Sequence, residues 1–213
     1  MPRFFSDNNV CFASANYPLT AAPDTLLMDE QVSALNRLSD WLVSYGNSSI
    51  HKQAYSNITF IAHSAGAHLT ALTDVRHGFN ANVKNLVLMD SGAYDLVQKL
   101  PLSSSRYRKE MSQLLDLNPL TTAQRVSRLR QFSPALIRPS KRPSSKPLNV
   151  FILSSRKDSH LISATALKSN YSNSPSRDVS IRTLPWKHSQ FPRMIGTSTS
   201  FSRSLLEKVI AAD

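Results

Sequence analysis

The sequence predicts an α/β fold, in which a mainly parallel sheet is flanked by helices. Short apolar segments typical of strands alternate with segments whose composition or three- and four-residue apolar spacing favours helices. One strand-like segment, VKNLVLMD, is apolar almost throughout, as expected for a strand covered on both faces. The 213 residues can also bury a sizeable core, so we expect a single domain over residues 1–213.

Five short apolar segments are expected to form the strands: residues 9–17, 57–62, 83–90, 148–155 and 178–184. The helices are expected between or after them: residues 27–46, 65–76, 106–117, 121–132, 160–173 and 200–212. The first of these helices has its apolar residues on one face and is closed by Gly46. The segment from about residue 96 to residue 147 interrupts the alternation of strands and helices, so we expect a helical insert between the third and fourth predicted strands.

Composition narrows the class of protein. The chain has no apolar run of the roughly 18 residues that a membrane span needs, and it begins without a recognisable secretion signal. Its single cysteine, Cys11, excludes an internal disulfide framework and is expected to be buried and inert in the first strand. We therefore expect a cytoplasmic protein without membrane contact.

The formal net charge of +11 raises the question of a nucleic-acid partner. The basic residues are scattered, apart from a cluster in the Pro- and Ser-rich residues 137–147, which contains no aromatic side chain for stacking on a base. We interpret this cluster as a solvated linker and expect no nucleic-acid binding, although binding of an anionic partner there is a weaker alternative.

A serine stands at the corner between a predicted strand and a predicted helix in NITFIAHSAGAHL, residues 57–69. The positions two before and two after Ser64 hold Ala62 and Gly66, which are small enough for strand and helix to approach across a sharp turn. The usual motif of this kind is GxSxG, and AHSAG differs from it by one methyl group. We predict that Ser64 is a nucleophile and that the backbone N–H of Ala65 stabilises an oxyanion.

A serine nucleophile needs an imidazole base and a carboxylate that orients the imidazole. Asp158 follows the strand at 148–155, and His188 follows the strand at 178–184. Functional groups of parallel sheets gather beyond the carboxyl ends of the strands, and the order Ser, Asp, His is the one that α/β-hydrolases use. The sequence therefore predicts a catalytic triad of Ser64, Asp158 and His188.

Two rivals to these assignments remain. Asp90, at the end of the strand at 83–90, is an alternative acid. His160 is an alternative base, but it is expected to open a helix before the last strand, where a base would be poorly placed. His63 and His68 have no cysteine or carboxylate at ligand spacing, and no Gly-rich phosphate loop is present, so we expect neither a metal nor another cofactor.

Several segments resemble the kynurenine formamidase and carboxylesterase branch of the α/β-hydrolases. They are NYPL, AHSAGAHL and SGAYDL, followed by FSP at residues 132–134, SSRKDSHLI and PWKHSQF. The resemblance covers nearly the whole chain and implies the same triad of Ser64, Asp158 and His188. It also implies an arylformamide such as N-formylkynurenine as the favoured substrate, and a lid or pocket wall formed by the insert.

The resemblance has one departure, because members of this branch carry an HGGxW-type oxyanion loop upstream of the NYRL-like segment. This sequence begins after the place of such a loop, so it resembles an N-terminally truncated member whose first sheet strands are missing. The leading hypothesis is a serine hydrolase of a small ester or amide. The alternative is a catalytically impaired or truncated homologue that binds a partner or has no independent activity.

Overall fold

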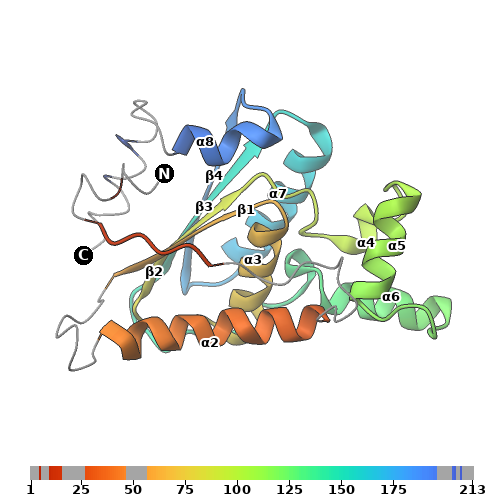
Figure 1. Ribbon diagram of the computed structural model, residues 1–213, viewed down its shortest axis with the longest axis horizontal. Coiled ribbons are helices and arrows are strands. Elements are labelled where there is room, and N and C mark those ends of the chain that lie inside the picture. The colour runs from red at the N-terminus through yellow and green to blue at the C-terminus, as the bar shows by residue number, and fades with distance from the viewer. Residues whose placement is uncertain are drawn as a thin grey trace.

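The computed structural model describes residues 5, 10–15, 27–46 and 57–195, together with residues 203, 204 and 207. At its centre lies a four-stranded sheet with the spatial order β1-β2-β3-β4, in which every neighbouring pair is parallel (Figure 1). The strands are β1 (Ile58–His63), β2 (Val83–Met89), β3 (Leu148–Ser155) and β4 (Arg177–Leu184). This arrangement confirms the predicted α/β class and brings the carboxyl ends of all four strands to one edge.

The helices connect and cover these strands. They are α2 (Met28–Gly46), α3 (Ala65–His77), α4 (Leu96–Lys99), α5 (Ser105–Leu114), α6 (Thr122–Gln131), α7 (Asp158–Ser172) and α8 (Phe191–Ile195), with short 3-10 helices η1 (Pro134–Leu136) and η2 (His188–Gln190). None of the described helices has both the length and the apolar character needed to cross a bilayer.

Alternation along β2 shows how the two faces of the sheet are covered. Leu86 and Leu88 belong to a large apolar core shared with α3 and α7, and α2 packs against the outer side of α3. Val87 and Met89 point to the opposite face, where Phe191 and other apolar residues close a smaller core. Every one of these β2 side chains is almost fully buried, because helices cover both faces of the sheet.

The expected insert is present between β2 and β3, and its helices α4–α6 lie beside the sheet in Figure 1. Local sequence signals explain where these helices begin. Asp95 accepts a hydrogen bond from the N–H of Gln98 at the start of α4, and Ser104 caps α5 in the same way. Thr121 and Gln124 form a reciprocal capping box at the start of α6.

The first predicted strand is not found in the sheet. Residues 10–15, which form the described part of the expected strand at 9–17, have no regular secondary structure, and Cys11 is exposed rather than buried. A short apolar run does not by itself specify a strand, because pairing with a neighbour decides whether one forms. The predicted last helix at 200–212 falls largely outside the described residues, although residues 203, 204 and 207 are helical.

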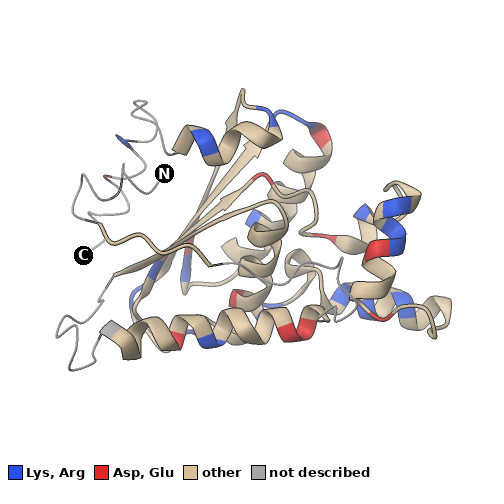
Figure 2. Cartoon of the chain, in the orientation of Figure 1, with Lys and Arg blue, Asp and Glu red and all other residues tan. Residues whose placement is uncertain are grey.

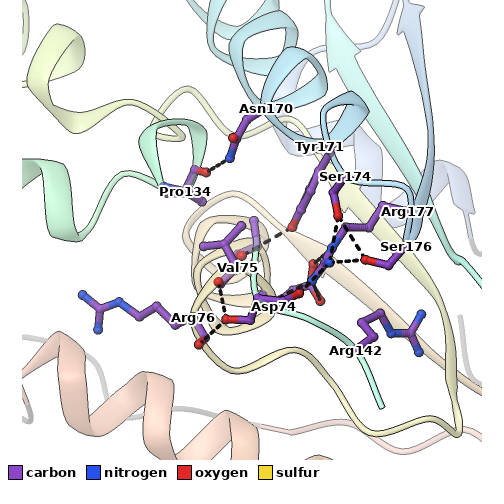
Figure 3. Close-up of polar contacts among 12 residues, drawn as sticks. Asp74, Val75, Arg76, Pro134, Arg142, Asn170, Tyr171, Ser174, Ser176 and Arg177 are labelled. Atoms are coloured by element: carbon purple, nitrogen blue, oxygen red, sulfur yellow. Dashed lines mark hydrogen bonds and ion pairs between the residues drawn. The ribbon is translucent and has the colours of Figure 1, made fainter. Parts of the chain in front are cut away.

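A buried ion pair joins the last turns of α3 to the start of β4 (Figure 3). Arg177 donates from Nε and an amino nitrogen to the two carboxylate oxygens of Asp74, at 3.0 and 3.1 Å, and both side chains are inaccessible to solvent. The same guanidinium donates to the carbonyl of Ser140 at 2.8 Å and to the hydroxyl of Ser176 at 2.6 Å. Its charge is therefore fully surrounded by acceptors.

Removing only one partner of this pair should be strongly destabilising. Arg177→Met leaves the Asp74 carboxylate buried and unpaired, and we expect it to lower the free energy of unfolding by about 3–5 kcal/mol in urea titrations. The double variant Asp74→Asn/Arg177→Met should recover much of this loss, because no isolated charge remains.

Arg106→Met is the matched control, because Arg106 forms an ion pair with Glu110 while its own side chain is 89% exposed. This exposed pair should contribute less than about 1 kcal/mol. Equal effects of Arg177→Met and Arg106→Met would contradict the structural role assigned to the buried pair.

Candidate active site

Ser64 occupies a strained turn between β1 and α3. Its φ of 56° and ψ of −119° lie outside the regions that a non-glycine residue usually adopts. Its N–H donates to the carbonyl of Met89 on β2 at 2.9 Å, which continues the pairing of the two strands through the turn. The serine is therefore held at the carboxyl edge of the sheet, immediately before the first turn of α3.

His188 begins η2 beyond β4, and its Nε2 lies 3.0 Å from the hydroxyl oxygen of Ser64. Its backbone carbonyl accepts a hydrogen bond of 2.9 Å from Nε2 of His63, and the two imidazole rings lie 4.4 Å apart. Burial, and then the proximity of His188, lower the pKa of His63, so this ring is neutral near pH 7 and donates through a single N–H. The residue before Ser64 thus fixes the loop that carries His188.

The carboxylate beside His188 belongs to Asp90. Its Oδ2 lies 2.8 Å from Nδ1 of His188, so Ser64, His188 and Asp90 form one continuous hydrogen-bonded chain. Asp90 is the first residue after β2 and, like Ser64, has a positive φ, of 48°. Its N–H donates to the carbonyl of Leu153 on β3 at 2.7 Å. The arrangement seen at Ser64, between β1 and β2, is thus repeated between β2 and β3.

The structure does not bring the predicted acid, Asp158, into this chain. Asp158 is the exposed first residue of α7, and no hydrogen bond joins it to His188 within the described part of the chain. A carboxylate at this position is favoured by the partial positive charge of a helix N-terminus. The carboxylate that contacts His188 is therefore that of Asp90, the rival acid, and not that of Asp158.

Asp90 is almost completely buried and is held from three sides. Besides the contact with His188, its Oδ1 accepts the N–H of Ser155 at 2.6 Å and lies 3.0 Å from Nδ1 of His160. Burial alone would raise the pKa of Asp90, but the contacts with His160, Ser155 and His188 outweigh it and hold the pKa well below its usual range. The carboxylate is therefore ionised at neutral pH.

His160, in the first turn of α7, is the histidine that the sequence offers as an alternative but poorly placed base. The structure places its ring behind the Asp90 carboxylate, at the oxygen that does not contact Nδ1 of His188, with Nδ1 of His160 3.0 Å from Oδ1 of Asp90. Gly92 makes room for its ring, because a Cβ added at Gly92 would stand 2.8 Å from Cδ2 of His160. Gly92 stands two residues beyond Asp90, in SGAYDL, and a glycine so close to an aspartate at a strand end is the sequence signal that could have indicated a ring packed behind that aspartate.

Metal ligation has one candidate group among the described residues. Single ligand atoms of Asp90, His160 and His188 lie within 4.8 Å of one another. His63 and His68, the two histidines considered as metal ligands from the sequence, are not part of this group. His68 is buried, and its Nε2 hydrogen-bonds to the carbonyl of Phe132 at 2.8 Å. Burial lowers the pKa of His68 to about 4, so it acts as a neutral tie between α3 and the residue after α6.

A cavity of about 990 Å³ opens beside Ser64 and His188. Apolar side chains from several elements line it: Met28, Leu69, Leu102, Met111, Leu114 and Trp186. Met111 and Leu114 belong to α5, so the insert forms part of the wall. Ala65 also faces this cavity, and as the first residue of α3 its N–H belongs to the amides that have no intrahelical acceptor.

The fold is similar to that of known esterases. An acetyl xylan esterase from Thermoanaerobacterium sp. JW/SL YS485 matches 94% of this chain with a TM-score of 0.56 and 12% sequence identity. An esterase from Pyrobaculum calidifontis matches 99% with a TM-score of 0.57 and 16% identity. The crystal structure of EstE5, soaked with p-nitrophenyl butyrate, matches 88% of this chain with a TM-score of 0.55 and 14% sequence identity.

This chain has the α/β-hydrolase fold. It spans 60% of the length of the acetyl xylan esterase and of EstE5, and 68% of the Pyrobaculum esterase. No protein-family model matches the sequence, and no curated protein matches it significantly. The likeness is to the fold shared by these esterases, and the narrower resemblance to kynurenine formamidases stays a prediction.

The lowered pKa of Asp90 predicts how stability depends on pH. Because the pKa of Asp90 in the folded protein lies below its unfolded value of about 4, Asp90 takes up a proton when the protein unfolds in acid. The stabilisation from Asp90 is therefore complete above the unfolded pKa and is lost as pH falls through the folded one. In urea titrations from pH 7 to pH 3, the wild type should lose more stability below about pH 4 than Asp90→Asn. Parallel pH profiles of the two proteins would contradict this electrostatic role.

Proposed function

We propose that this protein is a serine hydrolase that cleaves a small ester or amide through an acyl-enzyme on Ser64. The observation that supports this most directly is the continuous chain from the Ser64 hydroxyl through His188 to the buried Asp90 carboxylate, beside a partly apolar cavity. Each residue has the functional group that its place in this series of hydrogen bonds requires: Ser64 a hydroxyl, His188 an imidazole and Asp90 an ionised carboxylate.

The ionised Asp90 accepts the Nδ1–H of His188, which leaves Nε2 unprotonated and facing the serine. As the Ser64 oxygen attacks the substrate carbonyl, Nε2 takes the hydroxyl proton, and it then gives that proton to the leaving alcohol or amine. Water enters next and loses a proton to the same nitrogen while its oxygen attacks the acyl carbonyl. The acid product leaves, and the proton returns to Ser64.

Negative charge on the carbonyl oxygen also needs hydrogen-bond donors. The N–H of Ala65 is one such donor, because it follows the nucleophile and stands at the positive end of α3. The strained φ of Ser64 supports this assignment, since a sharp turn presents the serine oxygen and the following N–H to the same substrate carbonyl.

The substrate is proposed to be a small-molecule ester, or an arylformamide such as N-formylkynurenine. The ester is supported by the solved esterases that share the fold, and the arylformamide rests on the resemblance of AHSAGAHL and SGAYDL. Helices α4–α6 are proposed to act as pocket wall and lid, because residues of α4 and α5 line the cavity.

A fluorophosphonate probe tests whether Ser64 is activated, because such probes modify only nucleophilic serines. We expect covalent labelling of the wild type and none of Ser64→Ala, with attachment at Ser64 shown by peptide mass spectrometry. An unlabelled wild type with a cooperative unfolding transition would instead support the alternative, a homologue that binds without catalysis.

Matched substitutions decide which aspartate acts as the acid. Asp90→Asn should reduce kcat on p-nitrophenyl butyrate by about 10³- to 10⁴-fold, because the imidazole loses the partner that sets its tautomer. Asp158→Asn makes the same chemical change at an exposed helix start and should stay within about threefold of the wild type. The reverse order of effects would restore Asp158 as the acid.

A further inference from the structure

More basic than acidic side chains line the cavity that opens on Ser64. Four cationic side chains line it: Lys99, Arg156, Lys157 and Lys187. The acidic residue among the lining side chains is Glu110, and its carboxylate already accepts a hydrogen bond of 2.9 Å from Arg106. Figure 2 shows the same imbalance along α5 and α6, where blue Lys and Arg positions outnumber red ones. The cavity therefore has a positive charge that its own walls do not neutralise.

Lys99, at the end of α4, is the cation that can be placed relative to His160 and, through it, to Asp90. Its Nζ lies 3.5 Å from the point where a Cβ on Gly92 would stand, and the His160 ring approaches the same point to 2.8 Å. The ammonium thus lies beside the histidine that contacts Asp90. Within the described ranges, no carboxylate forms an ion pair with Lys99.

The environment of Lys99 disfavours its charge in the absence of an anion. Partial burial, and then the neighbouring ammonium of Lys157, lower the pKa of Lys99. An anion placed between these two lysines would offset both effects, because it supplies a counter-charge and hydrogen-bond acceptors. The apolar side chains of Met111 and Leu114 on the same cavity wall can cover a hydrocarbon portion.

We propose that the site selects esters or amides that carry a carboxylate, with Lys99 as the residue that recognises it. This inference rests on the proposed hydrolase function and narrows its substrate class. The substrate carbonyl lies at Ser64, its hydrocarbon portion against α5, and its carboxylate toward Lys99 and Lys157. The other cations at the cavity, Arg156 and Lys187, raise the local concentration of anionic substrates.

Paired substrates test the proposal on either side of the scissile bond. In the acyl pair, the p-nitrophenyl monoester of adipic acid is compared with p-nitrophenyl hexanoate. In the leaving-group pair, 3-carboxyphenyl butyrate is compared with 3-carbamoylphenyl butyrate. The carboxylate should raise kcat/KM by about ten- to a hundredfold in at least one pair, and high salt should reduce this preference.

Two charge-matched variants show whether Lys99 is responsible. Lys99→Gln should lower the charged-to-neutral ratio of kcat/KM by about ten- to a hundredfold. Lys109→Gln removes the same charge from an exposed position on α5 outside the cavity lining and should leave the ratio unchanged. No carboxylate preference in the wild type, or equal effects of both substitutions, would overturn the proposal.

A binding measurement separates failure of this inference from failure of the proposed function. Calorimetric titration of Ser64→Ala with adipate and with neutral adipamide needs no catalysis. Tighter binding of adipate that Lys99→Gln weakens would support the anion site even if no ester is cleaved. Hydrolysis of neutral esters, with equal binding of both compounds, would leave the hydrolase and remove the anion site.

Discussion

The geometry of the site depends on the buried ion pair between Asp74 and Arg177. Helix α3 begins directly after Ser64 and ends just beyond Asp74, while β4 begins at Arg177 and leads to His188. The pair therefore links the C-terminal part of α3, the helix that follows Ser64, to the N-terminal end of β4, the strand that leads to His188 (Figure 3). Because a buried pair is satisfied only in a narrow range of geometries, it limits how far these two elements can shift relative to each other.

The edge of the sheet that carries Ser64 and Asp90 is built by repeating one local backbone arrangement on adjacent strands. Ser64 and Asp90 each follow a strand directly, have a positive φ and donate their N–H to the next strand along. Such a φ costs about 1–3 kcal/mol at a residue with a side chain, so both turns need support from their surroundings. The covered parallel sheet provides it, and the two side chains meet at the imidazole of His188.

The sequence was informative where the signal is local. The small residues around Ser64 and the apolar strand before it specify the turn, and His188 follows a well-marked strand. Local sequence does not decide whether Asp90 or Asp158 contacts His188, because both aspartates follow strand ends. The contact depends on where α7 begins and on which carboxylate the loop of His188 reaches. Residues 10–15 failed as a strand for a related reason, since their sequence does not encode a pairing partner.

The place of β1 in the sheet has a consequence for how the protein behaves in concentrated solution. Among the described strands, β1 pairs with β2 alone, and all six of its residues are only partly buried, whereas β2 is almost entirely enclosed. An edge strand presents backbone donors and acceptors on which a strand of another molecule can add. Since β1 leads directly into the turn at Ser64, self-association through this edge would bring a second molecule close to that turn.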